Sequence, residues 1–129
     1  MNKTLIDTNV ILRYLLDDVE ELALMAEQVI EGGAWTTPEV LSEMTYVLES
    51  VYGFSRKDIA SALNIIFIHV EARPFDVVKR AIEEYEASGL DFVDCMMIGY
   101  ALSEKARVFT FDKGINRQLA SCRESTKKP

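Results

Sequence analysis

The stretch TLIDTNVIL, residues 4–12, decides how the rest of the sequence is interpreted. Its opening residues are apolar or β-branched, as in a short buried strand, and we expect that strand over residues 3–7. A helical pattern begins directly afterwards, at Asn9. The predicted strand therefore ends on a carboxylate, that of Asp7, at a point where the chain is about to be buried.

The same alternation of strand and helix continues along the chain. Strands are predicted for residues 3–7, within 34–39, for 67–72 and for 107–112, and helices for 9–16, 20–30, 39–52, 55–66, 74–87, 91–105 and 114–120. Such alternation is typical of a parallel sheet that is covered by helices on both faces. We therefore expect an α/β fold, a three-layer α/β/α sandwich with a central parallel sheet of four to five strands.

Length and composition limit the class of protein. The chain has 129 residues and a net charge of −7, so we expect one domain over residues 1–121 and a polar tail over 122–129. The acidic balance argues against general electrostatic binding of nucleic acid, and it fits a site that recruits cations or a basic partner. We expect no signal peptide and no membrane span. Cys95 and Cys122 have no metal or redox spacing, which favours reduced thiols and a cytoplasmic location.

Two of the predicted strands end on an aspartate, Asp7 after TLI and Asp112 after VFTF. In open α/β sheets, ligands bind outside the carboxyl ends of the strands, where the strand order reverses. If these strands are central neighbours, the two carboxylates face each other across that crevice. Either residue could instead cap the helix that follows it, and Asn9 could cap the first helix.

A third acid, Asp94, lies on an apolar helix. In DFVDCMMIGYAL, residues 91–102, it shares one face with Met97, Ile98, Ala101 and Leu102. A buried carboxylate must be hydrogen-bonded, paired or bound to a metal, because an isolated buried charge is costly. The alternative is a capping-box variant, with Asp91 as N-cap and Asp94 as its partner in the first turn.

A fourth acid, Glu43, lies at the edge of the apolar face of the helix over 39–52, whereas Glu39 and Glu49 lie further round. By itself it could be a solvated residue at the boundary. Four carboxylates in one cleft would repel each other unless a cation neutralised them. Oxygen-only ligands suit Mg²⁺ or Mn²⁺, and a carboxylate-bound pair of such ions is the usual apparatus for phosphodiester hydrolysis.

Other chemistries have little support in the sequence. His69 is the only histidine, so every Ser-His-Asp or Cys-His arrangement would depend on one residue in a predicted strand. The pair Gly32-Gly33 lacks the spacing and the following Lys-Ser/Thr of a phosphate-binding loop.

The acidic residues occur in an order that resembles a known family. DTN after the first strand, Glu43 in a mid-chain helix, DFVD opening a later helix and TFD closing a late strand resemble the PIN-domain ribonucleases. Within that family the chain is most similar to the VapC-type toxins of bacterial and archaeal toxin–antitoxin pairs. The resemblance covers residues 3–117, and the order of all four elements is more specific than DTN alone.

The resemblance implies a role for each matching residue. Asp7, Glu43, Asp94 and Asp112 would be the acidic quartet that binds Mg²⁺ or Mn²⁺. Supporting residues would be Asp91 as an outer-shell ligand or only an N-cap, Asn9 as a brace for Asp7, and Thr8 and Thr110 as polar neighbours of the acids. The family implies a five-stranded parallel sheet, metal-dependent endonucleolytic cleavage of RNA, a homodimer and a cognate antitoxin.

Some features depart from the family or leave alternatives open. No apolar run follows INRQLAS, residues 115–121, so a fifth strand would be short or absent. Arg13, one turn after Asn9, is the best candidate for a contact with RNA or antitoxin. Two other functions remain at this point: an Asp-based phosphohydrolase or phosphoryl acceptor, and a PIN fold that binds RNA or protein without cleavage.

Overall fold

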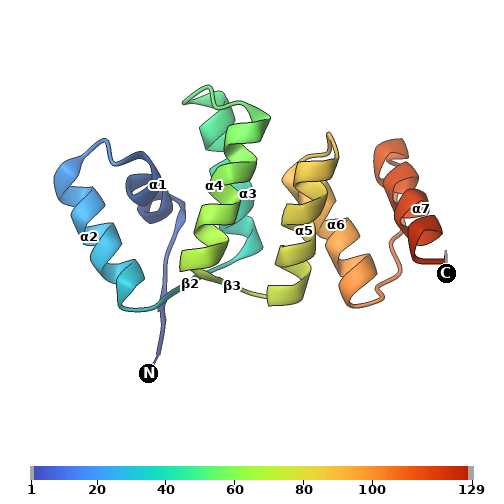
Figure 1. Cartoon of the computed structure of the whole chain (residues 1–129), viewed down its shortest axis with the longest axis horizontal. Helices are drawn as coiled ribbons and strands as arrows, with labels where there is room; N and C mark the ends of the chain where they lie inside the picture. Colours follow the sequence, from blue (N-terminus) through green and yellow to red (C-terminus); the bar gives the residue numbers. More distant parts are fainter. Residues whose placement is uncertain (1, 128–129) are drawn as a thin grey trace. The chain divides into compact units, whose positions relative to one another are not determined.

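The computed structural model describes residues 2–127, with side chains through residue 123 (Figure 1). The chain divides into two compact units, unit 1 over Met1–Phe75 and unit 2 over Asp76–Pro129. Both units contain buried apolar side chains.

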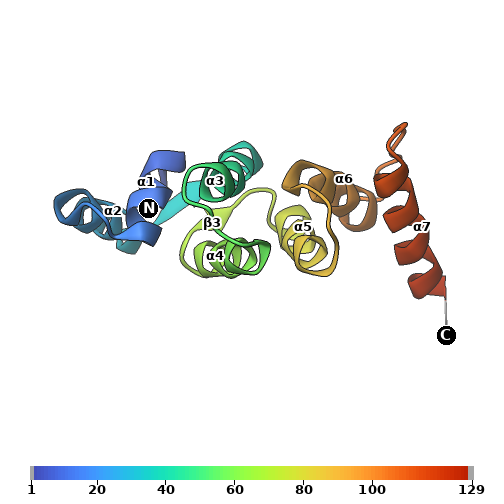
Figure 2. The same ribbon diagram turned by 90° about the horizontal axis from the view of Figure 1, so that it is seen from above.

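Unit 1 is a small parallel sheet with four helices. Its elements are β1 (Thr4–Leu5), α1 (Thr8–Leu16), α2 (Glu20–Glu31), β2 (Ala34–Thr36), α3 (Pro38–Ser50), α4 (Arg56–His69) and β3 (Glu71–Ala72). The strand order is β1-β2-β3 and both pairings are parallel. Helix α1 packs against α2 and α3, and α3 packs against α4 (Figures 1 and 2). The α/β class expected from the sequence is confirmed here.

Local capping explains where the helices of unit 1 begin. The Thr37 hydroxyl accepts a hydrogen bond from the Val40 N–H, and Pro38 occupies the first turn of α3, where its missing N–H costs nothing. The Ser55 hydroxyl accepts from the Asp58 N–H at 3.1 Å, so Ser55 is the N-cap of α4. The largest fully buried side chains of unit 1 are Ile11, Leu41, Met44, Leu48, Ile59, Leu63, Ile66 and Val70.

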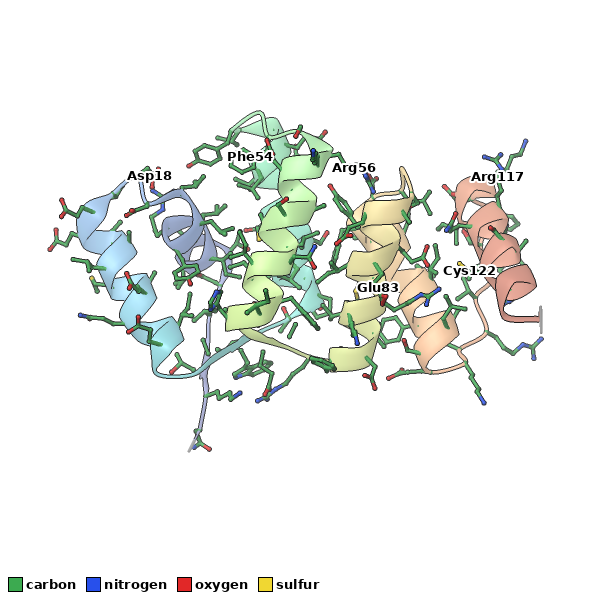
Figure 3. The ribbon with its side chains drawn as sticks, in the orientation of Figure 1. Asp18, Phe54, Arg56, Glu83, Arg117 and Cys122 are labelled. Atoms are coloured by element: carbon green, nitrogen blue, oxygen red, sulfur yellow. The ribbon has the colours of Figure 1, made fainter. Side chains whose placement is uncertain are left out.

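Unit 2 is helical in the part of the chain that the structure describes. Its helices are α5 (Phe75–Ala87), which starts at the last residue of unit 1, α6 (Phe92–Ser103) and α7 (Lys113–Lys127). Helices α6 and α7 pack together around a buried cluster of Ile98, Ile115, Leu119 and Cys122, the last of which is labelled in Figure 3. Cys95 and Cys122 are both buried and are not joined in a disulfide.

The prediction of a fourth strand over residues 107–112 is wrong, because the structure has neither helix nor strand there. Packed and exposed side chains still alternate along this segment. Val108 packs on the buried cluster, whereas Phe109 and Phe111 are 84% and 89% exposed. At the end of the segment the Asp112 N–H donates to the Thr110 hydroxyl at 3.0 Å. Such local side-chain bonds compete with a ladder. Among residues 2–127 the sheet therefore has three strands, and the four to five strands that we expected are not found.

Two further boundaries differ from the prediction. The strand expected over 67–72 is reduced to Glu71–Ala72, because helix α4 continues through His69 and buries Val70 directly after it. The last helix is longer than the expected 114–120, because buried Cys122 continues the i, i+4, i+7 face that Ile115 and Leu119 begin. Residues 122–127 of the expected tail are thus helical, and 128–129 lie outside the described residues.

A search of the described helices finds none that combines the length and the apolar character needed to cross a bilayer.

Candidate active site

The predicted quartet divides between the two units. Asp7 and Glu43 belong to unit 1, and Asp94 and Asp112 belong to unit 2. Within the described residues, no group of three or more His, Cys, Asp or Glu side chains is arranged to hold a metal ion. The quartet as one metal site therefore stays a prediction, and each half has a geometry of its own.

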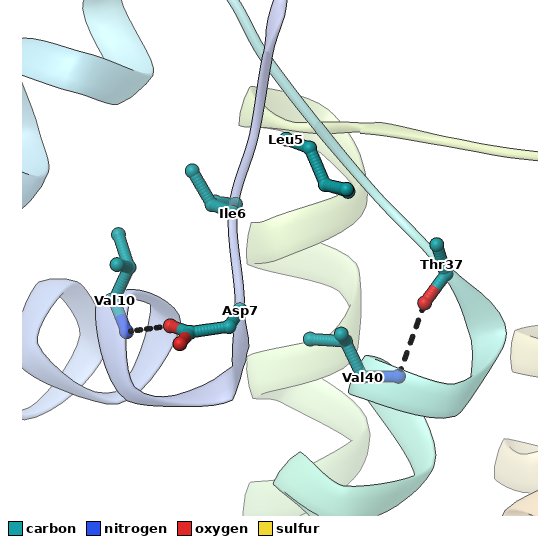
Figure 4. A pocket seen from close by; sticks show the side chains of 6 residues that line it. All are labelled: Leu5, Ile6, Asp7, Val10, Thr37 and Val40. Carbon is teal, nitrogen blue, oxygen red and sulfur yellow. Dashed lines mark hydrogen bonds between the residues drawn. The ribbon is translucent and has the colours of Figure 1, made fainter.

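Asp7 lies between β1 and α1 and is exposed. Its Oδ1 accepts a hydrogen bond from the Val10 N–H at 3.1 Å, so Asp7 is the N-cap of α1 (Figure 4). The capping interpretation is thus correct for this residue. A cap bond engages one carboxylate oxygen, and an ionised carboxylate can accept several bonds, so capping and cation binding are compatible.

A cavity of about 390 Å³ opens beside Asp7. Asp7 is the only carboxylate in its lining, which otherwise consists of Leu5, Ile6, Val10, Thr37 and Val40 (Figure 4). Glu43 does not line this cavity; it lies on α3, one turn beyond Val40, and is exposed. That exposure is what the boundary interpretation of Glu43 predicted.

Two buried threonines hold the backbone around Asp7. The Thr36 hydroxyl donates to the carbonyl of Ile6, the residue before Asp7, at 3.1 Å. The Thr8 hydroxyl, on the residue after Asp7, donates to the Val40 carbonyl at 3.5 Å. Thr8, which was expected beside the acids, is buried directly after Asp7. Asn9 is exposed, and its bracing of Asp7 stays a prediction.

Asp94 is half-buried in the first turn of α6, and two other acids of unit 2 lie near enough to affect it. Burial raises the pKa of the Asp94 carboxyl, and the charges of Asp112 and Asp91 raise it further. Asp91 occupies the N-cap position of α6, but its side chain makes no capping hydrogen bond. The capping box proposed for this pair is therefore not formed. Asp94 is thus the carboxylate on which the charges of Asp112 and Asp91 act.

Asp112 precedes α7, and its Oδ1 accepts from the Ile115 N–H at 2.9 Å. Capping is thus observed for this residue as well. The segment before it is fixed by Thr110, whose carbonyl accepts from the Asn116 side-chain amide at 3.0 Å. Thr110 was expected to neighbour the acids, and its hydroxyl contacts the Asp112 N–H.

Two residues that lie beside these carboxylates or bind the backbone next to them were not predicted from the sequence. A Cβ on Gly114 would lie 3.1 Å from Asp112 Oδ1 and 3.0 Å from Leu90 Cδ2, so a side chain there would press on the carboxylate. Thr36 is the other. Its only signal in the sequence is a hydroxyl in a strand that is otherwise apolar, and nothing local indicates its partner.

Arg13, the predicted contact for RNA or antitoxin, is engaged within unit 1. Its guanidinium forms an ion pair with Asp18 at 2.8 Å and a hydrogen bond with the Tyr52 hydroxyl at 3.1 Å. The hydrogen bond with Tyr52 raises the pKa of Arg13 most, and the Asp18 charge raises it further. Desolvation lowers this pKa, but its effect is smaller. The observed contacts join α1 to the segment after it, through Asp18, and to the turn after α3, through Tyr52. A contact with RNA or antitoxin stays a prediction.

Comparison with known proteins defines the class. The family model described as PIN domain matches residues 4–118, and this chain belongs to the PIN-domain family. The chain is similar to the VapC ribonuclease of Aquifex aeolicus (strain VF5), with 32% identity over 101 residues. That match covers 71% of this chain and 73% of the relative, so the chain is a PIN-domain protein of VapC type. No solved structure matches it.

The raised pKa of Asp94 predicts a dependence of stability on pH. In metal-free protein the folded state holds the Asp94 proton more tightly than the unfolded state does, so stability falls as pH rises through and above the ordinary carboxyl range. Asp94→Asn removes this cost, and the gain outweighs the small favourable interaction of a charge with the start of α6. We expect the variant in EDTA to need more urea for unfolding than the wild type at pH 7, but not at pH 3.

Asp76→Asn is the matched control, because Asp76 is an exposed first-turn acid of α5 in the same unit. Its urea midpoint should change little, and in the opposite direction, since only the helix-dipole interaction is lost. An Asp94→Asn midpoint below the wild-type value at pH 7 would show that the carboxylate is not repelled in the folded state.

Proposed function

We propose that this protein is a metal-dependent endoribonuclease and the toxin of a type II toxin–antitoxin module. The observation that carries the proposal is the match to the PIN-domain family over residues 4–118, together with the similarity to a VapC ribonuclease. Half-buried Asp94, on which the charges of Asp112 and Asp91 act, fits this proposal, because a cation would relieve the repulsion that Asp94 experiences. The comparisons support a nuclease, and RNA as its substrate follows from the relative's name.

The donor set fits Mg²⁺ or Mn²⁺. Asp7, Glu43, Asp94 and Asp112 would hold the ion, and all of them offer the carboxylate oxygens that these hard cations prefer. The ion, when bound, would lower the pKa of water and stabilise the charge that develops on the phosphate. For the remaining chemistry we assign Glu43 the positioning or deprotonation of the attacking water and Asp91 an outer-shell role.

The other parts of the proposal concern partners and location. We infer a cognate antitoxin that blocks cleavage and a homodimer, as the resemblance to VapC-type toxins implies, and a cytoplasmic location, which the two free cysteines favour. The net charge of −7 fits a partner of basic character. Arg13 is the residue we assign to contact with RNA or antitoxin. A short neighbouring reading frame for a small DNA-binding protein would support the toxin assignment.

A cleavage assay with a mixed-sequence RNA pool tests the enzymatic part directly. We expect endonucleolytic products with Mg²⁺ or Mn²⁺ and none in EDTA, because the carboxylates alone would repel the phosphate. Calorimetric titration with Mn²⁺ of the same preparation reports the metal without reference to activity. Cleavage that persists in EDTA would contradict the proposed chemistry, and failure to bind Mn²⁺ or to cleave would favour a non-catalytic PIN fold.

A further inference from the structure

Thr36 is a fully buried polar residue in the central strand of unit 1. Its side chain is 0% exposed, and β2 lies between β1 and β3. A buried hydroxyl costs free energy unless it is hydrogen-bonded, and valine would fill the same volume without that cost. The hydroxyl must therefore be explained by the bond it makes, which runs from Thr36 Oγ1 to the Ile6 carbonyl at 3.1 Å.

The acceptor of this bond belongs to the peptide that joins Ile6 to Asp7. The N–H of Ile6 donates to the Trp35 carbonyl at 3.0 Å, so Ile6 is held to β2 through both of its backbone groups. Strand β1 itself ends at Leu5. The Thr36 side chain thus extends the attachment beyond the strand, up to the peptide that leads into Asp7.

The direction of that peptide sets the direction of the Asp7 side chain. Asp7 is extended, with φ −98° and ψ −178°, and its Oδ1 accepts from the Val10 N–H at 3.1 Å. If the Ile6 carbonyl could rotate, the Asp7 Cα–Cβ bond would move with it, and the cap bond would have to follow. The hydrogen bond from the Thr36 hydroxyl opposes that rotation.

We propose that Thr36 is a positioning residue that fixes the Asp7 carboxylate for RNA cleavage. This inference rests on the proposed function, because it assigns Asp7 a role in the reaction. Thr36 does not line the cavity beside Asp7, so it acts through the Ile6–Asp7 peptide and not by contact with substrate.

Three variants separate positioning from stability. Thr36→Val removes the hydroxyl at nearly constant shape, and Thr36→Ser keeps the hydroxyl. Ile59→Val is the matched control, because Ile59 is also fully buried in unit 1, on α4, and loss of one methylene there costs stability without affecting a peptide next to an assigned catalytic residue. Urea midpoints should fall to similar extents in the two valine variants.

Cleavage kinetics should then distinguish them. We expect Thr36→Val to lower kcat by roughly 10- to 100-fold, the range expected when a reacting group is displaced by about 1 Å, with KM for RNA nearly unchanged. Thr36→Ser should restore most of kcat, and Ile59→Val should keep it. Equal kcat in the two valine variants would overturn the proposal, as would a serine variant no more active than the valine one.

A second measurement does not depend on activity. The Val10 amide is protected by the Asp7 cap, so its hydrogen exchange reports the position of the carboxylate. We expect faster Val10 exchange in Thr36→Val than in Ile59→Val at equal stability. If wild-type protein fails to cleave RNA, the proposed function is wrong, and Val10 exchange still decides whether Thr36 positions Asp7. Equal exchange in the two variants would overturn the inference.

Discussion

Asp7→Asn is expected to lower RNA cleavage by roughly 10²–10³-fold, the loss typical when a group that stabilises transition-state charge is removed. The asparagine side chain has the same shape, and its oxygen can still accept from the Val10 N–H, since asparagine is as good an N-cap as aspartate. Only the negative charge is lost. Helix α1 should therefore form as before, while binding of the cation weakens.

The measurement is kcat/KM on one RNA in Mg²⁺, together with the urea midpoint. Asp17→Asn is the matched control on the same helix: Asp17 is the C-cap of α1, exposed and left-handed with φ 49°, a conformation that asparagine tolerates well. The control should cleave like the wild type. Full activity of Asp7→Asn would remove Asp7 from the catalytic residues.

The second large effect is on stability. Gly99→Ala should destabilise the protein by about 1–3 kcal/mol, the usual cost of overpacking a core. An ordinary helix interior would gain close to 1 kcal/mol from this change. At Gly99 the sign reverses, because the new Cβ would lie 2.6 Å from the Val77 carbonyl oxygen and 3.2 Å from its Cγ1. The carbonyl belongs to the backbone of α5, so it cannot turn aside as a flexible side chain would.

Equilibrium unfolding in urea measures this effect. Gly89→Ala serves as the control, because Gly89 lies between α5 and α6 of the same unit and a Cβ there would meet no atom within 4 Å. It should unfold close to the wild-type midpoint. A Gly99→Ala protein as stable as the wild type would mean that α5 and α6 are not as closely packed as described.

Most helices could be predicted from the sequence because their signals are local. Ser55 and the Thr37-Pro38 pair mark the starts of α4 and α3, where the two hydroxyls accept the capping hydrogen bonds. The aspartates after β1 and before α7 were predicted as possible caps, and both accept the expected N–H bonds. Such features depend on residues three or four positions apart, so periodicity and residue type are sufficient to find them.

The segment over 107–112 shows where local prediction fails. Its aromatic and β-branched residues have the propensity for a strand, but a strand is defined by hydrogen bonds to a neighbour. The segment keeps only the alternating exposure of a strand, with Val108 packed and Phe109 exposed. The ladder is a tertiary feature, and no periodicity within six residues can supply it.

The sequence by itself determined the family and the order of the acidic residues along the chain, because both are properties of residue type and spacing. Only the tertiary structure decided that Asp94 is half-buried near Asp112 and Asp91, and that the Thr36 hydroxyl holds the peptide before Asp7. Thr36 and Ile6 are 30 residues apart. A hydrogen bond over that separation exists only when parallel strands are in register, so no local pattern could reveal how Asp7, the carboxylate that ends TLID, is held in place.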